Sequence, residues 1–143
     1  MSRQKHLLDV NVVIALSDAD HQHHARVMQW LQMPGLDWGL CAFSEAGFLR
    51  VSINPGVGKL TKDQAMALLA SMALHPGFRY WPIRVEWAAL AAPIQERVFG
   101  HQQITDAYML GLAIKESGVL VTLDKAIKSL AGARYSRNVL VLD

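Results

Sequence analysis

The hydrophobic positions of this chain form short, almost wholly apolar runs, separated by longer segments with apolar side chains at every third or fourth position. Short runs bounded by turn residues are typical of buried strands, and a three-to-four-residue period is typical of amphipathic helices. The pattern predicts strands over residues 6–10, 36–42, 80–84, 119–122 and 139–142. It predicts helices over 11–17, 21–32, 44–53, 61–73, 86–99 and 106–117, with a short helix through 127–130.

Strands that alternate with helices, and that are too apolar to have a face in water, favour a parallel sheet covered on both sides. We therefore expect the α/β class, as a three-layer α/β/α sandwich around a central, mainly parallel sheet. The sequence contains no linker, repeat or low-complexity tract, so we expect one domain over residues 1–143.

Polar residues at the predicted helix ends act as start and stop signals. Asp18-Ala19-Asp20, Ser44 and Thr105 are expected to cap the helices that follow them, and Thr61 with Gln64 has the capping-box spacing. Pro93 should kink the helix over 86–99 or divide it in two, because proline lacks the N–H that a helix interior needs.

The composition excludes several classes of protein. Of the 143 residues, 52% are hydrophobic and 18% are charged, which argues against disorder. The single cysteine, Cys41, excludes an internal disulfide and a cysteine-rich zinc site. No apolar run reaches the ~18–20 residues of a membrane span, and the first residues lack the apolar core of a signal peptide. We expect a cytoplasmic protein with no membrane partner.

The formal net charge is +2, and basic residues gather near the C-terminus. Between residues 115 and 137 stand Lys115, Lys125, Lys128, Arg134 and Arg137, against Glu116 and Asp124. A basic surface of this kind can attract a phosphate backbone, but an ordinary solvated surface explains the same charges equally well. Lys125 is a candidate substrate-binding residue on this basis.

Four carboxylates interrupt apolar segments or follow a buried strand directly: Asp9, Glu45, Asp106 and Asp124. A buried carboxylate must be paired, bind a metal or become neutral. Interaction with a helix dipole or a capping role explains Glu45, Asp106 or Asp124 singly, but Asp9 lies in the middle of its apolar run. The recurrence of one anomaly favours a shared site, and Asp9 and Asp124 fall at the carboxyl ends of strands, where α/β sheets bind ligands.

Carboxylates that meet at one edge of a sheet repel each other, and a divalent cation relieves the repulsion. Oxygen ligands suit Mg²⁺ or Mn²⁺. A cation in such a cluster indicates phosphodiester hydrolysis by metal-activated water, with one metal ion or with two ions about 3.5–4 Å apart. The sequence contains no GxSxG motif and no glycine-rich phosphate loop that would indicate another chemistry.

Four segments, in order and over nearly the whole chain, carry a family resemblance: residues 7–16, 44–50, 105–113 and 121–124. In them the chain resembles a PIN domain, and specifically a VapC-type ribonuclease toxin of a type II toxin–antitoxin pair. The resemblance implies a Mg²⁺- or Mn²⁺-dependent endoribonuclease that cuts tRNA or rRNA. It also implies a homodimer and a cognate antitoxin that inhibits the enzyme.

The resemblance also assigns roles to individual residues. It makes the four carboxylates named above the catalytic metal ligands, and it makes Asn11 and Thr122 the polar partners that orient Asp9 and the reacting water. It makes Arg50 a candidate contact to the substrate phosphate. A surface ion pair for Arg50 and a helix-capping role for Asn11 remain alternative explanations.

Three other classes of protein compete with this interpretation. A receiver-type phosphoacceptor domain needs an acidic pair after its first strand, and a phosphatase of the haloacid dehalogenase type needs an aspartate where Asn11 stands. A non-catalytic PIN fold that only binds RNA or regulates a partner usually has a broken acidic set, whereas this set is complete. RNA cleavage that depends on a metal and on Asp9 separates the enzyme from all three alternatives.

Overall fold

The computed structural model describes residues 3–143, and its centre is a four-stranded parallel sheet in the order β2-β1-β3-β4. The strands are β1 (Lys5–Leu8), β2 (Asp37–Gly39), β3 (Val119–Thr122) and β4 (Val139–Val141). Leu7 of β1 is in register with Gly39 of β2 and with Leu120 of β3. The parallel sheet of the predicted α/β class is therefore confirmed.

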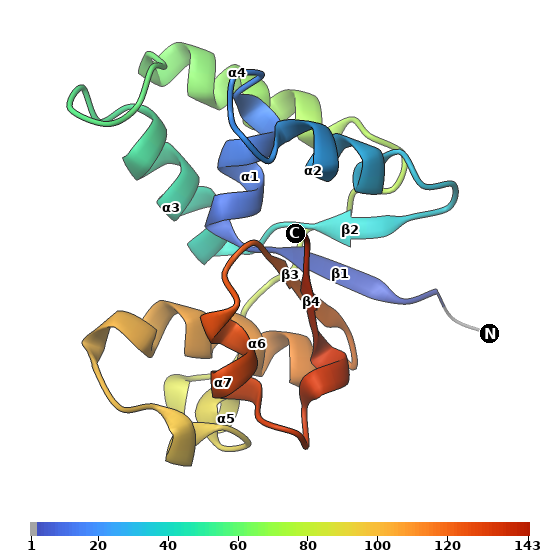
Figure 1. Ribbon diagram of the computed structural model, residues 1–143, viewed down its shortest axis with the longest axis vertical. Coiled ribbons are helices and arrows are strands. Elements are labelled where there is room, and N and C mark those ends of the chain that lie inside the picture. The colour runs from blue at the N-terminus through green and yellow to red at the C-terminus, as the bar shows by residue number, and fades with distance from the viewer. Residues whose placement is uncertain (1–2) are drawn as a thin grey trace.

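Helices cover both faces of the sheet (Figure 1). One layer holds α1 (Val10–Ser17), α2 (His24–Leu31), α3 (Ala42–Ser52) and α4 (Lys62–Ala73). The other holds α5 (Trp87–Ala91), α6 (Ile104–Lys115) and α7 (Ala126–Ala131). Three short 3₁₀ helices, at Gln95–Arg97, His101–Gln103 and Ser136–Asn138, lie in the connections.

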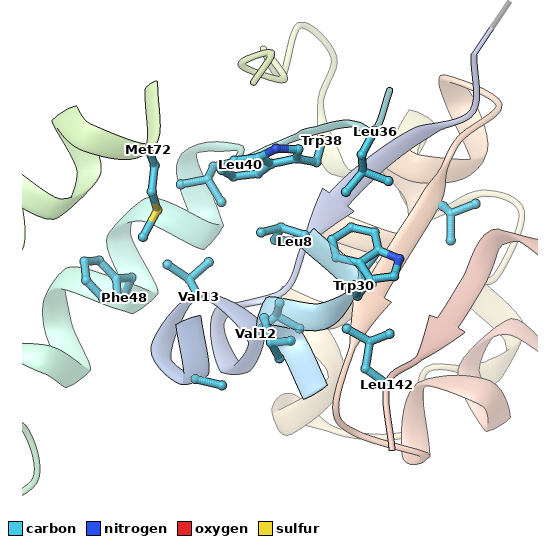
Figure 2. Packing of buried hydrophobic residues seen from close by; sticks show 14 of the residues in the cluster. Leu8, Val12, Val13, Trp30, Leu36, Trp38, Leu40, Phe48, Met72 and Leu142 are labelled. Atoms are coloured by element: carbon cyan, nitrogen blue, oxygen red, sulfur yellow. The ribbon is translucent and has the colours of Figure 1, made fainter. Parts of the chain in front are cut away.

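The central strands supply side chains to two separate hydrophobic cores, one on each face. Leu8 and Val121 belong to the core under α1 to α4, whereas Leu7 and Leu120 belong to the core under α5 to α7. Successive residues of a strand point to opposite faces, so a strand buried on both sides must be apolar throughout. Figure 2 shows the first core, in which Val13 of α1 points toward Phe48 of α3.

Helix α6 is apolar on nearly every side because it packs between the sheet and α5. Ala107 and Leu110 through Ala113 are all buried in it. A side chain at Gly111 would place its Cβ 2.2 Å from the carbonyl oxygen of Leu90 in α5. Glycine at this position therefore allows α5 to approach α6 closely.

The predicted strand over residues 80–84 is wrong. The segment runs beside the end of β2, where the N–H groups of Arg79 and Trp81 donate to the carbonyl oxygens of Trp38 and Leu40, both at 2.8 Å. The next residue that could donate on this side is Ile83, but its partner position, Ala42, is already the first residue of α3, so the pairing ends without a regular strand. The predicted helix over 86–99 is divided after α5, as expected from Pro93.

Three of the predicted caps are wrong. Helix α3 begins at Ala42, so Ser44 lies inside its first turn, and α6 begins at Ile104, so Thr105 lies inside it as well. Helix α2 begins only at His24, because the segment from Asp18 forms a turn in which Asp18 Oδ1 accepts from the N–H of Asp20 at 3.0 Å. The box of Thr61 and Gln64 at the start of α4 is confirmed, with bonds of 2.9 and 3.1 Å.

Within residues 3–143, no helix is both long enough and apolar enough to cross a membrane. The expectation of one domain over residues 1–143 stays a prediction. Residues 1–2 of that range lie outside the described part of the chain.

Candidate functional site

Asp9 is a buried carboxylate at the junction between β1 and α1. It is the N-cap residue of α1, and the residue is only 5% exposed. Its Oδ1 accepts from the N–H of Val10 at 2.7 Å, and its Oδ2 accepts from the hydroxyl of Thr122 at 2.7 Å. Asp9 thus has a structural role as a cap, and it also faces the end of β3.

Thr122 and Asn11 connect the junction after β1 to the junction after β3. The hydroxyl oxygen of Thr122 accepts from the N–H of Asp124 at 3.0 Å and from Asn11 Nδ2 at 3.3 Å. Asn11 Oδ1 in turn accepts from the N–H of Leu123 at 3.1 Å. The structure therefore brings Asn11 and Thr122 to Asp9, as the sequence predicted, and fixes the direction of the Thr122 hydroxyl.

Asp106 and Asp124 join Asp9 at the same edge of the sheet. The pKa of Asp106 is raised from 3.8 to about 7, mainly by burial and further by the charges of Asp9 and Asp124. The pKa of Asp9 is also raised, because burial and the charge of Asp124 outweigh the hydrogen bonds from Thr122 and Val10. Each group acts electrostatically on another, so these three carboxylates form one negative site.

Glu45 lies in the first turn of α3 and is half-buried. The pKa of the Tyr80 phenol is raised mainly by burial, and the charges of Glu45 and Cys41 raise it further. It is not among the charges that act on Asp9 or Asp106. Glu45 therefore acts electrostatically on Tyr80, and it is not part of the group of three aspartates that act on one another.

Ser44 holds the start of α3 against β1. Its buried hydroxyl donates to the carbonyl oxygen of Leu8 at 2.7 Å, one residue before Asp9. From the sequence, Ser44 is predicted only as a helix cap, and this contact is not predicted. The available signal was a serine next to Glu45 in an otherwise apolar segment, but nothing in the sequence identifies its partner, 36 residues away.

Among residues 3–143, no lysine or arginine forms an ion pair with the three aspartates. The ion pairs among residues 3–143 join Lys5 to Glu116 and Lys59 to Asp18 and Asp20. The candidate substrate-binding residues Arg50 and Lys125 are both exposed. Lys125 adjoins Asp124, whereas Arg50 lies in the last turn of α3, about 7 Å farther along the helix axis than Glu45.

The chemistry of this group of side chains fits a hard divalent cation. Asp9, Asp106 and Asp124 offer carboxylate oxygens, and Asn11 and Thr122 offer an amide and a hydroxyl oxygen. Such oxygens are the ligands that Mg²⁺ and Mn²⁺ prefer. The cation site is not preassembled, however. In the described part of the chain, no three histidine, cysteine, aspartate or glutamate side chains already stand where they could hold a metal ion. Asp124 is exposed, and its Oδ1 accepts from the N–H of Ala126 at 2.9 Å.

Comparisons with known proteins agree with this fold. The family model of the PIN domain matches residues 6–133. Ribonuclease VapC39 of Mycobacterium tuberculosis is 36% identical over 130 residues, which cover 89% of this chain and 94% of the relative. Ribonuclease VapC38 of the same organism is 36% identical over 139 residues, covering 95% and 96% of the two chains.

Among solved structures, VapBC2 from Rickettsia felis, bound to a DNA fragment from its promoter, matches with a TM-score of 0.68. The match covers 98% of this chain and 100% of that chain at 12% identity, so it supports the fold alone. The chain is a PIN domain by fold and by family match. It belongs to the PIN domain family and, within that family, to the VapC group.

The raised pKa of Asp106 predicts how stability depends on pH in metal-free protein. The pKa is about 7 in the folded state against 3.8 ordinarily, so the folded state holds an extra proton between these values. The free energy of unfolding should then decrease as the pH rises through this window. The Asp106→Asn side chain cannot ionise, so the free energy of unfolding of this variant should not decrease in this way. The difference in free energy of unfolding, variant minus wild type, should therefore be smallest near pH 4 and greatest near pH 8. Urea unfolding in EDTA measures the difference.

The control is Asp63→Asn, which removes an exposed carboxylate in the first turn of α4. Its stability relative to wild type should change little over the same pH range. If the curves for Asp106→Asn and wild type run parallel from pH 4 to pH 8, Asp106 is not held neutral by its neighbours.

Proposed function

We propose that this protein is an endoribonuclease that hydrolyses RNA phosphodiester bonds with a divalent cation, Mg²⁺ or Mn²⁺, and that it is the toxin of a toxin–antitoxin pair. The observation that carries the proposal is the group of three mutually repelling aspartates, Asp9, Asp106 and Asp124, which has no basic partner in the described chain. The chain's similarity to ribonucleases VapC39 and VapC38 supports the activity.

In this proposal Asp9, Asp106 and Asp124 hold the cation, with Glu45 approaching from α3. When bound, the cation supplies Lewis-acid activation of water and stabilises the charge that develops on the phosphate. Because no lysine or arginine of the described chain pairs with these carboxylates, their negative charge is available to attract a cation.

The remaining polar residues orient these ligands. Thr122 donates to Asp9 Oδ2 and keeps the carboxylate in one rotamer, and Asn11 in turn fixes Thr122 through its Nδ2. Groups of this kind typically contribute 10–100-fold to metal affinity or activity. In the metal-free protein below about pH 7, the Asp106 carboxyl holds a proton that it must release before it can act as a ligand.

We propose RNA, in particular tRNA or rRNA, as the substrate, and a cognate antitoxin as the partner. The VapC group and the structural similarity to VapBC2 support the antitoxin. A negative site without internal cations is complementary to an arginine side chain, which binds carboxylates through two charge-assisted hydrogen bonds. The homodimer implied by the resemblance stays a prediction.

The activity is tested by incubating the purified protein with tRNA and rRNA in Mg²⁺, in Mn²⁺ and in EDTA. Cleavage products should form with either cation and be absent in EDTA. Asp9→Asn removes the charge but keeps the shape, and we expect cleavage to decrease by about 100-fold or more, because Asp9 would bind the cation directly. Gel analysis of end-labelled RNA measures the rate.

Asp63→Asn is the matched control and should cleave at the wild-type rate. Equal cleavage in EDTA would contradict the metal dependence. RNA binding without cleavage under all three conditions would instead support the non-catalytic PIN-fold alternative.

The toxin role is tested by inducing the protein in a bacterial host with and without the product of the neighbouring reading frame. Induction alone should stop growth, and coexpression should restore it, because the partner covers the negative site. If the purified complex cleaves RNA as fast as the free protein does, the inhibitory partner is contradicted, whatever the outcome of the cleavage assay.

A further inference from the structure

A hollow of about 630 Å³ lies at the end of the sheet opposite the three aspartates. Gln4, Ser117 and Asn138 line it, and these residues directly or closely precede β1, β3 and β4. The hollow is therefore at the amino ends of the strands, whereas the aspartates are at the carboxyl ends. Its volume is within the range of small-molecule and cofactor sites.

The hollow combines cations, an aromatic ring and hydrogen-bond acceptors. Arg134 and Arg137 line it and are exposed, and the Arg134 guanidinium lies 5.3 Å from the centre of the Tyr135 ring. The amide groups of Gln4 and Asn138 donate to the carbonyl oxygens of Ser117 and Gly118, at 3.1 and 2.9 Å. Each amide thus has its oxygen left to accept a hydrogen bond from a ligand.

Helix α7 connects the aspartate site to this hollow. It follows directly after Asp124 and Lys125, and the chain after it, residues 132–138, leads to the hollow and then to β4 (Figure 1). Six helical residues span about 9 Å. Figure 1 shows α7 beside α6, on the side of the sheet away from α1 to α4.

Basic side chains occur along the whole of this path. Lys125 and Lys128 are exposed and stand three residues apart, on one side of the helix. Arg97 donates through Nη1 to the carbonyl oxygen of Ser129 at 3.2 Å and is also exposed. We call Lys125, Lys128, Arg97, Arg134 and Arg137 the α7 track. None of the five forms an ion pair with an acidic residue of the described chain.

We propose that the α7 track binds the phosphate backbone of the RNA substrate outside the cleaved bond, so that the RNA runs from the aspartate site along α7 into the hollow. This inference rests on the proposed function, since it extends the substrate of that site. Guanidinium groups bind phosphates through paired hydrogen bonds. The Tyr135 ring and the amide oxygens fit the base and the 2′-hydroxyl of a nucleotide.

An acidic protein segment is the alternative occupant of the track. Its carboxylates would pair with the five cations, but they only accept hydrogen bonds and so could not use the amide oxygens, whereas the 2′-hydroxyls of RNA donate. The mixed lining of the hollow therefore favours RNA.

The test is the binding of a fluorescein-labelled 30-nucleotide RNA of mixed sequence to the full-length protein in EDTA, over a range of NaCl concentrations. For Arg134→Ala/Arg137→Ala, we expect roughly tenfold weaker binding at low salt. The slope of log K against log [NaCl] should decrease by about 1.4, or 0.7 for each lost phosphate contact. Arg134→Lys/Arg137→Lys keeps both charges and should retain most of the slope.

The matched control is Lys59→Ala/Lys62→Ala, which removes two exposed cations near the start of α4, in the other helical layer. It should keep the wild-type slope. Urea unfolding checks that each double variant is folded. If a double variant does not fold, the single variants Arg134→Ala and Arg137→Ala replace it, and each should lower the slope by about 0.7.

The proposal is overturned if the Arg134 and Arg137 variants bind the RNA with the wild-type slope, or if the control loses as much affinity as they do. It is also overturned if a polyglutamate peptide binds the track and the RNA does not. Because the assay is done in EDTA and measures binding alone, its failure is distinguishable from a failure of RNA cleavage, which would contradict the proposed function instead.

Discussion

The structure depends on how it holds one buried carboxylate, Asp9, at the point where β1 becomes α1. Burial penalises the charge, and the hydrogen bonds from Val10 and Thr122 recover only part of the cost, so the pKa of Asp9 is raised. The Thr122 bond also fixes β3 beside β1, because its donor and acceptor come from positions 113 residues apart. The same interaction therefore starts a helix, links two central strands and creates a site with excess negative charge.

The proposed chemistry follows from that excess. Asp106 and Asp124 add negative charge next to the buried carboxylate of Asp9. In the described part of the chain, neither forms an ion pair with a lysine or an arginine. Proteins keep such arrangements mainly where an external cation or a proton removes the repulsion. The opposite end of the sheet has the opposite character, with the exposed Arg134 and Arg137 around the hollow. A substrate with a negative backbone would thus be attracted along α7 and reach the negative site only with its cation.

The sequence predicted the features that depend on burial and failed where a contact between distant residues decides the outcome. The apolar runs predicted the four strands of the sheet, and the carboxylate in the middle of the first run predicted the place where Asp106 and Asp124 act on Asp9, because buried segments are recognisable from their composition. Ser44 is a residue type that often caps helices, but in the structure α3 begins two residues earlier, at Ala42, and the Ser44 hydroxyl donates to Leu8 instead. Residues 80–84 have strand-like composition, but the neighbouring chain turns into α3 at Ala42 and offers no further strand partner. The electrostatic effect of Glu45 on Tyr80, rather than on the three aspartates, depends on how α3 packs, which no local pattern encodes.

The central claim is that acids from three separate elements form one cation site. X-ray diffraction from crystals soaked in Mn²⁺, with data collected near the manganese absorption edge, tests it most directly. The account predicts an anomalous peak bonded to oxygen atoms of Asp9, Asp106 and Asp124. Absence of a peak at a saturating Mn²⁺ concentration, or a peak bonded to residues elsewhere in the protein, would contradict it.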